Sequence, residues 1–201
     1  MTRTYVAIAS IVAARTASGA RTLKQLPRWP LASLASAAVV ATAIIVPVNA
    51  GGEKVAFPAD YDKGVLFTTV DRPDNKQYRE FYTSAAALDA AKKGQPLPSG
   101  TVIVMVQNAS KLDAQGNPEK DANGRFIKTN VIGYTVMEKR TGWGAEYPDN
   151  VRNGEWEYQA FKADKTPNTA ANLTACFNCH KPLDARQDYV FLYDKMKAAA
   201  K

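Results

Sequence analysis

The sequence predicts an α+β fold, in which a mainly antiparallel β-sheet has a few helices packed against one side. Two long strand-like segments, residues 101–107 and 125–139, follow each other with only a polar segment between them. Strands joined without a crossover helix pair antiparallel, because a parallel pair needs a longer connection. Helix-like segments occur only before the first of these strands and at the C-terminus, so the chain lacks the strand and helix alternation of a parallel sheet.

The first half of the body contains three predicted elements. Residues 65–70 form a short strand after a turn-rich segment. Residues 76–94 are predicted to be a helix with its C-terminal cap, with Ala and Leu in its interior, two lysines in its last turn and Gly94 at the capping position. Residues 101–107 are β-branched and apolar on both faces, which predicts a buried strand.

The second half contains two strands and a final helix. Residues 108–124 are polar and rich in Asn, Asp and Gly, which predicts an exposed loop or wide hairpin before the long strand at 125–139. Residues 154–161 alternate as a strand does, and residues 188–201 predict a terminal helix. The apolar face of the alternating strand would carry Trp156, Tyr158 and Ala160.

Residues 1–50 have the features of a signal peptide. A basic start is followed by Leu31–Val46, which is apolar but diluted by Ala, Ser and Thr, and then by small residues up to Ala50. A membrane-spanning helix needs about 20 apolar residues, whereas a secretory segment needs fewer. We expect cleavage after Ala50, with an uncleaved N-terminal membrane anchor as the alternative. In both cases residues 51–201 form one domain outside the cytoplasm, which we expect to be periplasmic.

The charge distribution argues against a nucleic-acid-binding protein. The chain has a net charge of +7. Residues 1–50 contain five of the 26 basic side chains and no acidic one, which leaves 21 basic against 19 acidic side chains in the body. A nearly neutral body has no basic stripe to pair with phosphates.

Residues 174–182, TACFNCHKP, contain both cysteines and the only histidine of the chain. Cys-x-x-Cys-His is the attachment motif of c-type haem, in which two thiols bond to the vinyl groups and the histidine binds the iron. The motif therefore predicts one covalently bound haem c, attached through Cys176 and Cys179, with His180 as an axial iron ligand.

Three other interpretations of this motif fit the sequence less well. Structural zinc needs four ligands, and the chain supplies three Cys or His side chains. A thioredoxin-like redox pair is expected in a βαβ setting that this chain lacks. A structural disulfide suits an exported protein but leaves the adjacent histidine unexplained.

With one histidine in the chain, a second histidine of the same chain cannot be the sixth iron ligand. Met105 is the first candidate for that position, and Met137 and Met196 are further ones. Methionine in a strand usually fills the core, so lysine, another weak ligand and an open sixth position are the other possibilities.

Several blocks of the body together resemble the cytochrome P-460 and cytochrome c′-β family. They occur in the family's order: VAFPADY (55–61), residues 81–107, TGWGAEYP (141–148), ACFNCH (175–180) and DYVFLYD (188–194). The resemblance implies a mainly antiparallel β fold with few helices, a homodimer, and a single c-type haem with a proximal histidine. It assigns Cys176 and Cys179 to haem attachment and His180 to the iron.

The same resemblance implies one of two activities. The P-460 enzymes oxidise hydroxylamine and carry a lysine cross-linked to the porphyrin, whereas the c′-β proteins lack the cross-link, have an apolar distal pocket and bind nitric oxide. The family's lysine would lie where this chain has Met105. Lys111 and Lys128 are the remaining candidates for a cross-link.

Other side chains are candidates for the side of the haem away from His180. Phe67 and Phe81 would cap it with apolar rings, and Glu146 and Arg140, which flank the sequence TGWG, would act as proton carriers. Trp143 would pack against the sheet or the porphyrin edge.

Three functional hypotheses follow. The first is a protein that handles nitrogen oxides, by binding nitric oxide or by acting as a hydroxylamine-oxidising oxidoreductase, together with a periplasmic redox partner. The second is an electron-transfer cytochrome with His180 and Met105 as axial ligands. The third is a haem module that serves a larger complex, tethered to the membrane through its N-terminus.

Overall fold

The computed structural model describes residues 53–200 of the chain. The predicted signal peptide and its cleavage position at Ala50 lie outside these residues. Within the described part, no helix combines the length and the apolar character that crossing a membrane requires.

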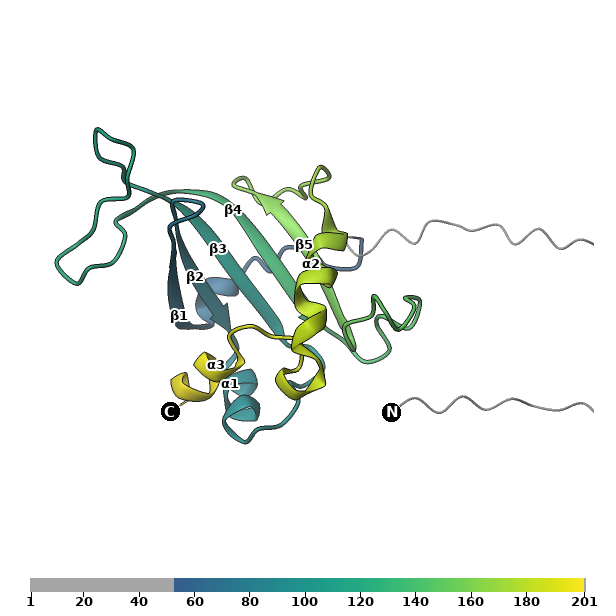
Figure 1. Ribbon diagram of the computed structural model, residues 1–201. Coiled ribbons are helices and arrows are strands. Elements are labelled where there is room, and N and C mark those ends of the chain that lie inside the picture. The colour runs from purple at the N-terminus through teal and green to yellow at the C-terminus, as the bar shows by residue number, and fades with distance from the viewer. Residues whose placement is uncertain (1–52, 201) are drawn as a thin grey trace, which may run out of the picture. The chain divides into compact units, whose positions relative to one another are not determined.

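A five-stranded antiparallel sheet forms the centre of this part of the chain (Figure 1), which confirms the predicted α+β fold. Each strand pairs with the next one along the chain, so the sheet is a meander in the order β1-β2-β3-β4-β5. The strands are β1 (Val65–Arg72), β2 (Gln77–Thr83), β3 (Val102–Ser110), β4 (Lys128–Lys139) and β5 (Trp156–Lys162).

The predicted helix at residues 76–94 is wrong in its first half. Residues Gln77–Thr83 form β2 between β1 and β3, and only Ala85–Lys92 forms a helix, α1. The Ser84 side chain ends the strand and caps the helix by accepting a hydrogen bond from Ala87 N at 3.2 Å. At the other end Gly94 has φ 67°, which is the left-handed conformation predicted for this glycine.

The C-terminal part of the chain is helical in shorter pieces than predicted. Helix α2 (Leu173–His180) carries the cysteine motif, and two 3-10 turns follow it, η2 (Lys181–Leu183) and η3 (Ala185–Gln187). The last helix, α3 (Tyr193–Ala199), begins five residues later than expected. Helices α1 and α3 pack together near β1, while α2 lies along β5 (Figure 1).

Both faces of the sheet are covered. One face packs against the helices in a core that includes Phe67, Leu88, Trp156, Phe177 and Met196. The other packs against the segment before β1, which contains a short 3-10 turn, η1 (Tyr61–Lys63), in a core of the following residues: Val55, Val104, Val106, Tyr134, Val136 and Phe161. The alternation predicted for residues 154–161 is present, but the polar side chains on its second face are also buried: Glu157 and Gln159.

Candidate functional site

Helix α2 places the three chemically distinctive residues of the chain close together. Cys176, Cys179 and His180 are spaced three and four residues apart, so they share one face of the helix. Cys176 is half-buried and Cys179 is exposed, and both are free thiols. The helix ends at His180, where the chain turns into η2.

The His180 ring is fixed by three neighbours. Its Nδ1 lies 2.6 Å from the carbonyl oxygen of Tyr189, and the rings of Tyr158 and Phe191 each lie 5.0 Å from it, centroid to centroid. A carbonyl can only accept, so Nδ1 carries the proton and Nε2 keeps the free lone pair. Burial lowers the pKa of His180, although the bond to Tyr189 opposes this, and a neutral imidazole is the form that binds metal.

His180 and Cys179 line a cavity of about 330 Å³ between the C-terminal segment and the sheet. Pockets of about 300–1,000 Å³ are usual for cofactors and small ligands. The C-terminal segment contributes three further apolar side chains: Val190, Phe191 and Leu192. The sheet contributes both apolar side chains and two arginines: Phe67, Val70, Arg72, Arg79, Phe81, Ile103, Met105 and Met137.

The chemistry of these residues fits a covalently held haem. A neutral imidazole and a free thiol open onto an apolar cavity, as the cofactor's iron and porphyrin require. The alternatives fit less well. Among residues 53–200, no three His, Cys, Asp or Glu side chains are grouped to hold a metal ion, and burial raises the pKa of Cys176, whereas redox cysteines need a low pKa.

Comparison with known protein families also indicates a haem cofactor. The family model of Cytochrome P460 matches residues 58–192, which is more than half of the chain. The chain belongs to the Cytochrome P460 family. Membership implies a haem cofactor and suggests that the protein acts on nitrogen compounds. No curated protein matches the sequence.

In this member of the Cytochrome P460 family, two of the three candidate methionines line the cavity. Met105 on β3 and Met137 on β4 both face it from the sheet. Met196 is fully buried in the helix-side core and does not line the cavity. Met105 pairs with Phe81 across β2 and β3, and both residues line the cavity that His180 also lines.

The two candidate lysines are held elsewhere by carboxylates. Lys111 forms an ion pair with Glu119 at 2.7 Å, and Lys128 forms one with Glu80 at 2.6 Å. Neither lysine lines the cavity of the described structure. Their positions therefore give no support to a cross-link with a haem in this cavity.

The aromatic and charged candidates separate into two groups. Phe67 and Phe81 both line the cavity, with ring centroids 6.2 Å apart. The candidate proton carriers Glu146 and Arg140 do not line it.

The residues around the TGWG turn instead form a polar cluster of their own. Glu146 is ion-paired with Lys54, and Arg140 with Glu138. Trp143 packs in the core on the second face of the sheet, with the cations of Lys54 and Arg140 each 5.9 Å from its ring.

Two arginines of the cavity were missed in the sequence. Arg79 on β2 is half-buried, and its Nε donates to Gln77 Oε1 at 2.9 Å; Arg72 on β1 is paired with Asp74. Burial and the like charge of Arg72 lower the pKa of Arg79 below its ordinary value, and the guanidinium is still charged at neutral pH. The sequence feature that could have revealed Arg79 is the alternation in β2, which puts Arg79 and Phe81 on one face of the sheet.

Proposed function

We propose that the protein is an exported cytochrome with one haem c, attached through Cys176 and Cys179, whose iron is held by His180 and binds a small nitrogen oxide. The observation that carries the proposal is the cavity that His180 shares with apolar side chains of the sheet. An apolar wall opposite the iron ligand favours a neutral diatomic ligand such as nitric oxide.

Each residue of the site has a distinct task in this proposal. The two thiols fix the cofactor to α2, and Nε2 of His180 binds the iron while Nδ1 stays bonded to Tyr189. Phe67 and Phe81 exclude water from the sheet side of the cavity. A bound haem would supply an iron that binds diatomic ligands and exchanges electrons.

Oxidation of hydroxylamine is the less supported activity within the family. In the family resemblance, the enzymes that oxidise hydroxylamine carry a cross-linked lysine. This chain has Met105 at the matching position, and Lys111 and Lys128 are ion-paired away from the cavity. We therefore favour ligand binding over turnover.

A second candidate function rests on the position of Met105. Because its side chain lines the same cavity as His180, it offers a thioether as a sixth iron ligand. A methionine ligand would raise the reduction potential and close the iron to gases, giving an electron carrier.

Optical spectra of the exported protein, oxidised and reduced, with and without nitric oxide, test these functions. We expect a high-spin spectrum that changes when nitric oxide binds, and the same spectrum in Met105→Leu. A low-spin spectrum that nitric oxide does not change, and that becomes high-spin in Met105→Leu, would instead establish the electron carrier. A strongly red-shifted Soret band would indicate a cross-linked chromophore.

We also propose that the protein works in the periplasm, as a homodimer, with a separate redox partner. The support is the leader sequence at residues 1–50 and the family resemblance. The intact mass of the purified protein tests cleavage after Ala50, since a retained leader would favour a membrane tether. Sedimentation at several protein concentrations tests the dimer, and a single monomeric species would contradict it.

A further inference from the structure

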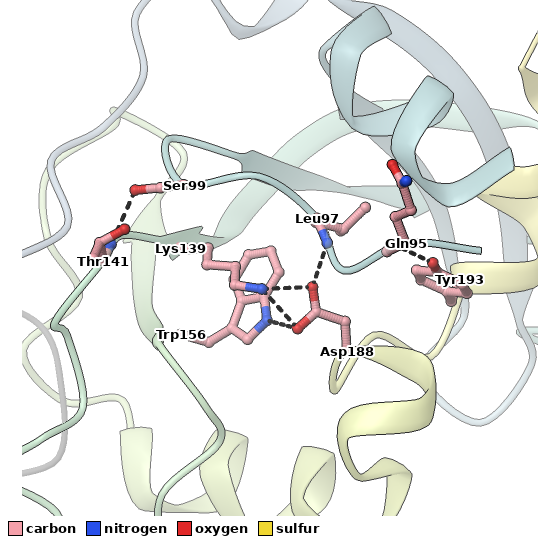
Figure 2. Close-up of polar contacts among 8 residues, drawn as sticks. All are labelled: Gln95, Leu97, Ser99, Lys139, Thr141, Trp156, Asp188 and Tyr193. Carbon is pink, nitrogen blue, oxygen red and sulfur yellow. Dashed lines mark hydrogen bonds and ion pairs between the residues drawn. The ribbon is translucent and has the colours of Figure 1, made fainter. Parts of the chain in front are cut away.

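A buried ion pair joins Asp188, eight residues after His180 in the chain, to Lys139 (Figure 2). Asp188 accepts hydrogen bonds from Lys139 Nζ at 3.0 and 2.9 Å, and each of the two side chains is 9% exposed. The same carboxylate accepts from Leu97 N at 2.7 Å and from Trp156 Nε1 at 3.3 Å. Its oxygens are therefore satisfied by three separate parts of the chain.

These three segments of the chain surround the Asp188 carboxylate. Lys139 ends β4, Trp156 begins β5, and Leu97 lies in the connection from α1 to β3. That connection is itself held on both sides of Leu97, by Tyr193 OH donating to Gln95 O at 2.6 Å and by Thr141 N donating to Ser99 Oγ at 2.9 Å (Figure 2). A buried charge pair is stable only when its geometry is fixed and its hydrogen bonds are complete.

The carboxylate fixes a strained turn of the backbone. Asp188 and the next residue, Tyr189, both have positive φ, 47° and 58°. Non-glycine residues rarely adopt this conformation and keep it only where surrounding contacts impose it. Gly154 helps by allowing close approach, because a Cβ on it would lie 3.1 Å from the Tyr189 ring.

The strained turn ends at the carbonyl that accepts the proton of His180. Tyr189 O lies 2.6 Å from His180 Nδ1, so any shift of the turn changes this bond directly. A histidine that donates its second ring proton to a fixed acceptor is a stronger donor to metal through its other nitrogen.

We propose that Asp188 is a positioning residue for His180. Its buried ion pair with Lys139 holds the Tyr189 carbonyl in place, and that carbonyl sets the strength of the Nδ1 hydrogen bond and so the donor strength of Nε2. The inference deepens the proposed function, since it concerns the residue that would bind the haem iron.

The test uses the full chain loaded with haem, with Asp188→Asn and with the double variant Asp188→Asn/Lys139→Met, which leaves no unpaired buried charge. His180 is the only histidine, so its Nδ1 proton gives a single imidazole NMR signal in the reduced, carbon monoxide-bound protein. We expect an upfield shift of this signal, about tenfold faster exchange with water, and a higher reduction potential in both variants.

Asp71→Asn is the matched control. Asp71 also accepts from a cation and a backbone amide, Arg125 Nε at 2.9 Å and Phe126 N at 3.3 Å, but it does not line the cavity or contact His180. We expect Asp71→Asn to lower the free energy of unfolding, while the His180 Nδ1 signal and the reduction potential stay as in the wild type.

The proposal is overturned if the double variant folds and keeps the wild-type His180 signal and potential, because Asp188 would then only stabilise the fold. A chain that attaches no haem would contradict the proposed function instead. Comparing the His180 Nδ1 signal of the variants and the wild type on that haem-free chain would still decide the role of Asp188, because the bond to Tyr189 lies within the chain itself.

Discussion

At the scale of single residues, Arg79 gives a mainly apolar cavity one of its two positive charges, the other being that of Arg72. Its guanidinium is half-buried on β2, two positions from Phe81, and its Nε is held by Gln77. A charge in such a position attracts anions more strongly than it would in water, because the surroundings screen it less. Arg79 should therefore decide whether the site admits anionic ligands such as azide or nitrite beside neutral nitric oxide.

Replacing the arginine should separate the two ligand classes. In Arg79→Leu we expect azide and nitrite to bind about tenfold more weakly, because a favourable charge interaction is lost. Nitric oxide, which is neutral, should bind as in the wild type. Optical titrations of the haem-loaded protein with each ligand measure both affinities.

Arg186→Leu provides the control for this substitution. Arg186 is 87% exposed and paired with Asp184, so its loss should change neither affinity. An equal loss of azide and nitric oxide binding in Arg79→Leu would mean that the arginine shapes the cavity rather than selecting ligands by charge.

At the scale of elements, one buried amide attaches the motif helix to the sheet. Asn153 lies just before β5 and is fully buried. Its Nδ2 donates to Tyr158 OH and to Phe177 O, both at 3.0 Å. The first bond reaches β5 and the second reaches the middle of α2, so the amide fixes the helix that carries the cysteines.

Asn153→Ala should loosen this attachment. We expect the free energy of unfolding to fall by about 1–3 kcal/mol, because buried partners lose their hydrogen bonds. Urea unfolding of the haem-loaded protein measures the change. Asn123→Ala, on an exposed turn, should stay within about 0.5 kcal/mol of the wild type. Similar results for both variants would show that the amide does not hold α2.

The elements also show where a local sequence pattern is enough to predict a strand or helix and where it is not. The strands at β3, β4 and β5 were predictable because their β-branched or alternating residues have no competing interpretation. The segment of β2 was predicted to be helical because an alanine-rich helix follows it directly. The boundary is set by Ser84, whose capping role becomes clear only once the pairing of β2 with β1 and β3 is known.

The residues of the candidate site also differ in whether the sequence alone reveals them. Cys176, Cys179 and His180 were found because their chemistry lies within five consecutive positions. Arg79 comes to the same cavity from about a hundred residues earlier, and Lys139 reaches Asp188 across 49 residues. No spacing rule connects such residues, since the register of the sheet and the path of the C-terminal turn bring them together.

At the scale of the whole molecule, covering both faces of the sheet buries a carboxylate on the polar face of the alternating strand β5. The Glu157 side chain is fully buried on β5. Its Oε2 accepts from Tyr147 OH at 3.0 Å, and Lys54 Nζ lies 3.5 Å from Oε1. Burial raises the pKa of Glu157 above 4.5, although the bond from Tyr147 and the charge of Lys54 oppose the shift.

This raised pKa gives the folding stability a definite pH dependence. Between the ordinary pKa of 4.5 and the higher folded value, the folded chain binds more protons at Glu157 than the unfolded chain does. The free energy of unfolding then falls as the pH rises through this window. Glu157→Gln keeps an acceptor for Tyr147 but does not titrate, so we expect its stability relative to the wild type to grow from about pH 4.5 upward and then level off.

Urea unfolding at a series of pH values from 4 to 8 measures this difference between the variant and the wild type. Glu119→Gln, which removes a partly exposed partner of Lys111 on the loop after β3, should give a curve nearly parallel to that of the wild type. A constant difference for Glu157→Gln across the range would mean that Glu157 ionises alike in the folded and unfolded chains. Its contact with Lys54 would then fully offset the effect of burial, and the second face of the sheet would tolerate a charge at no cost in stability.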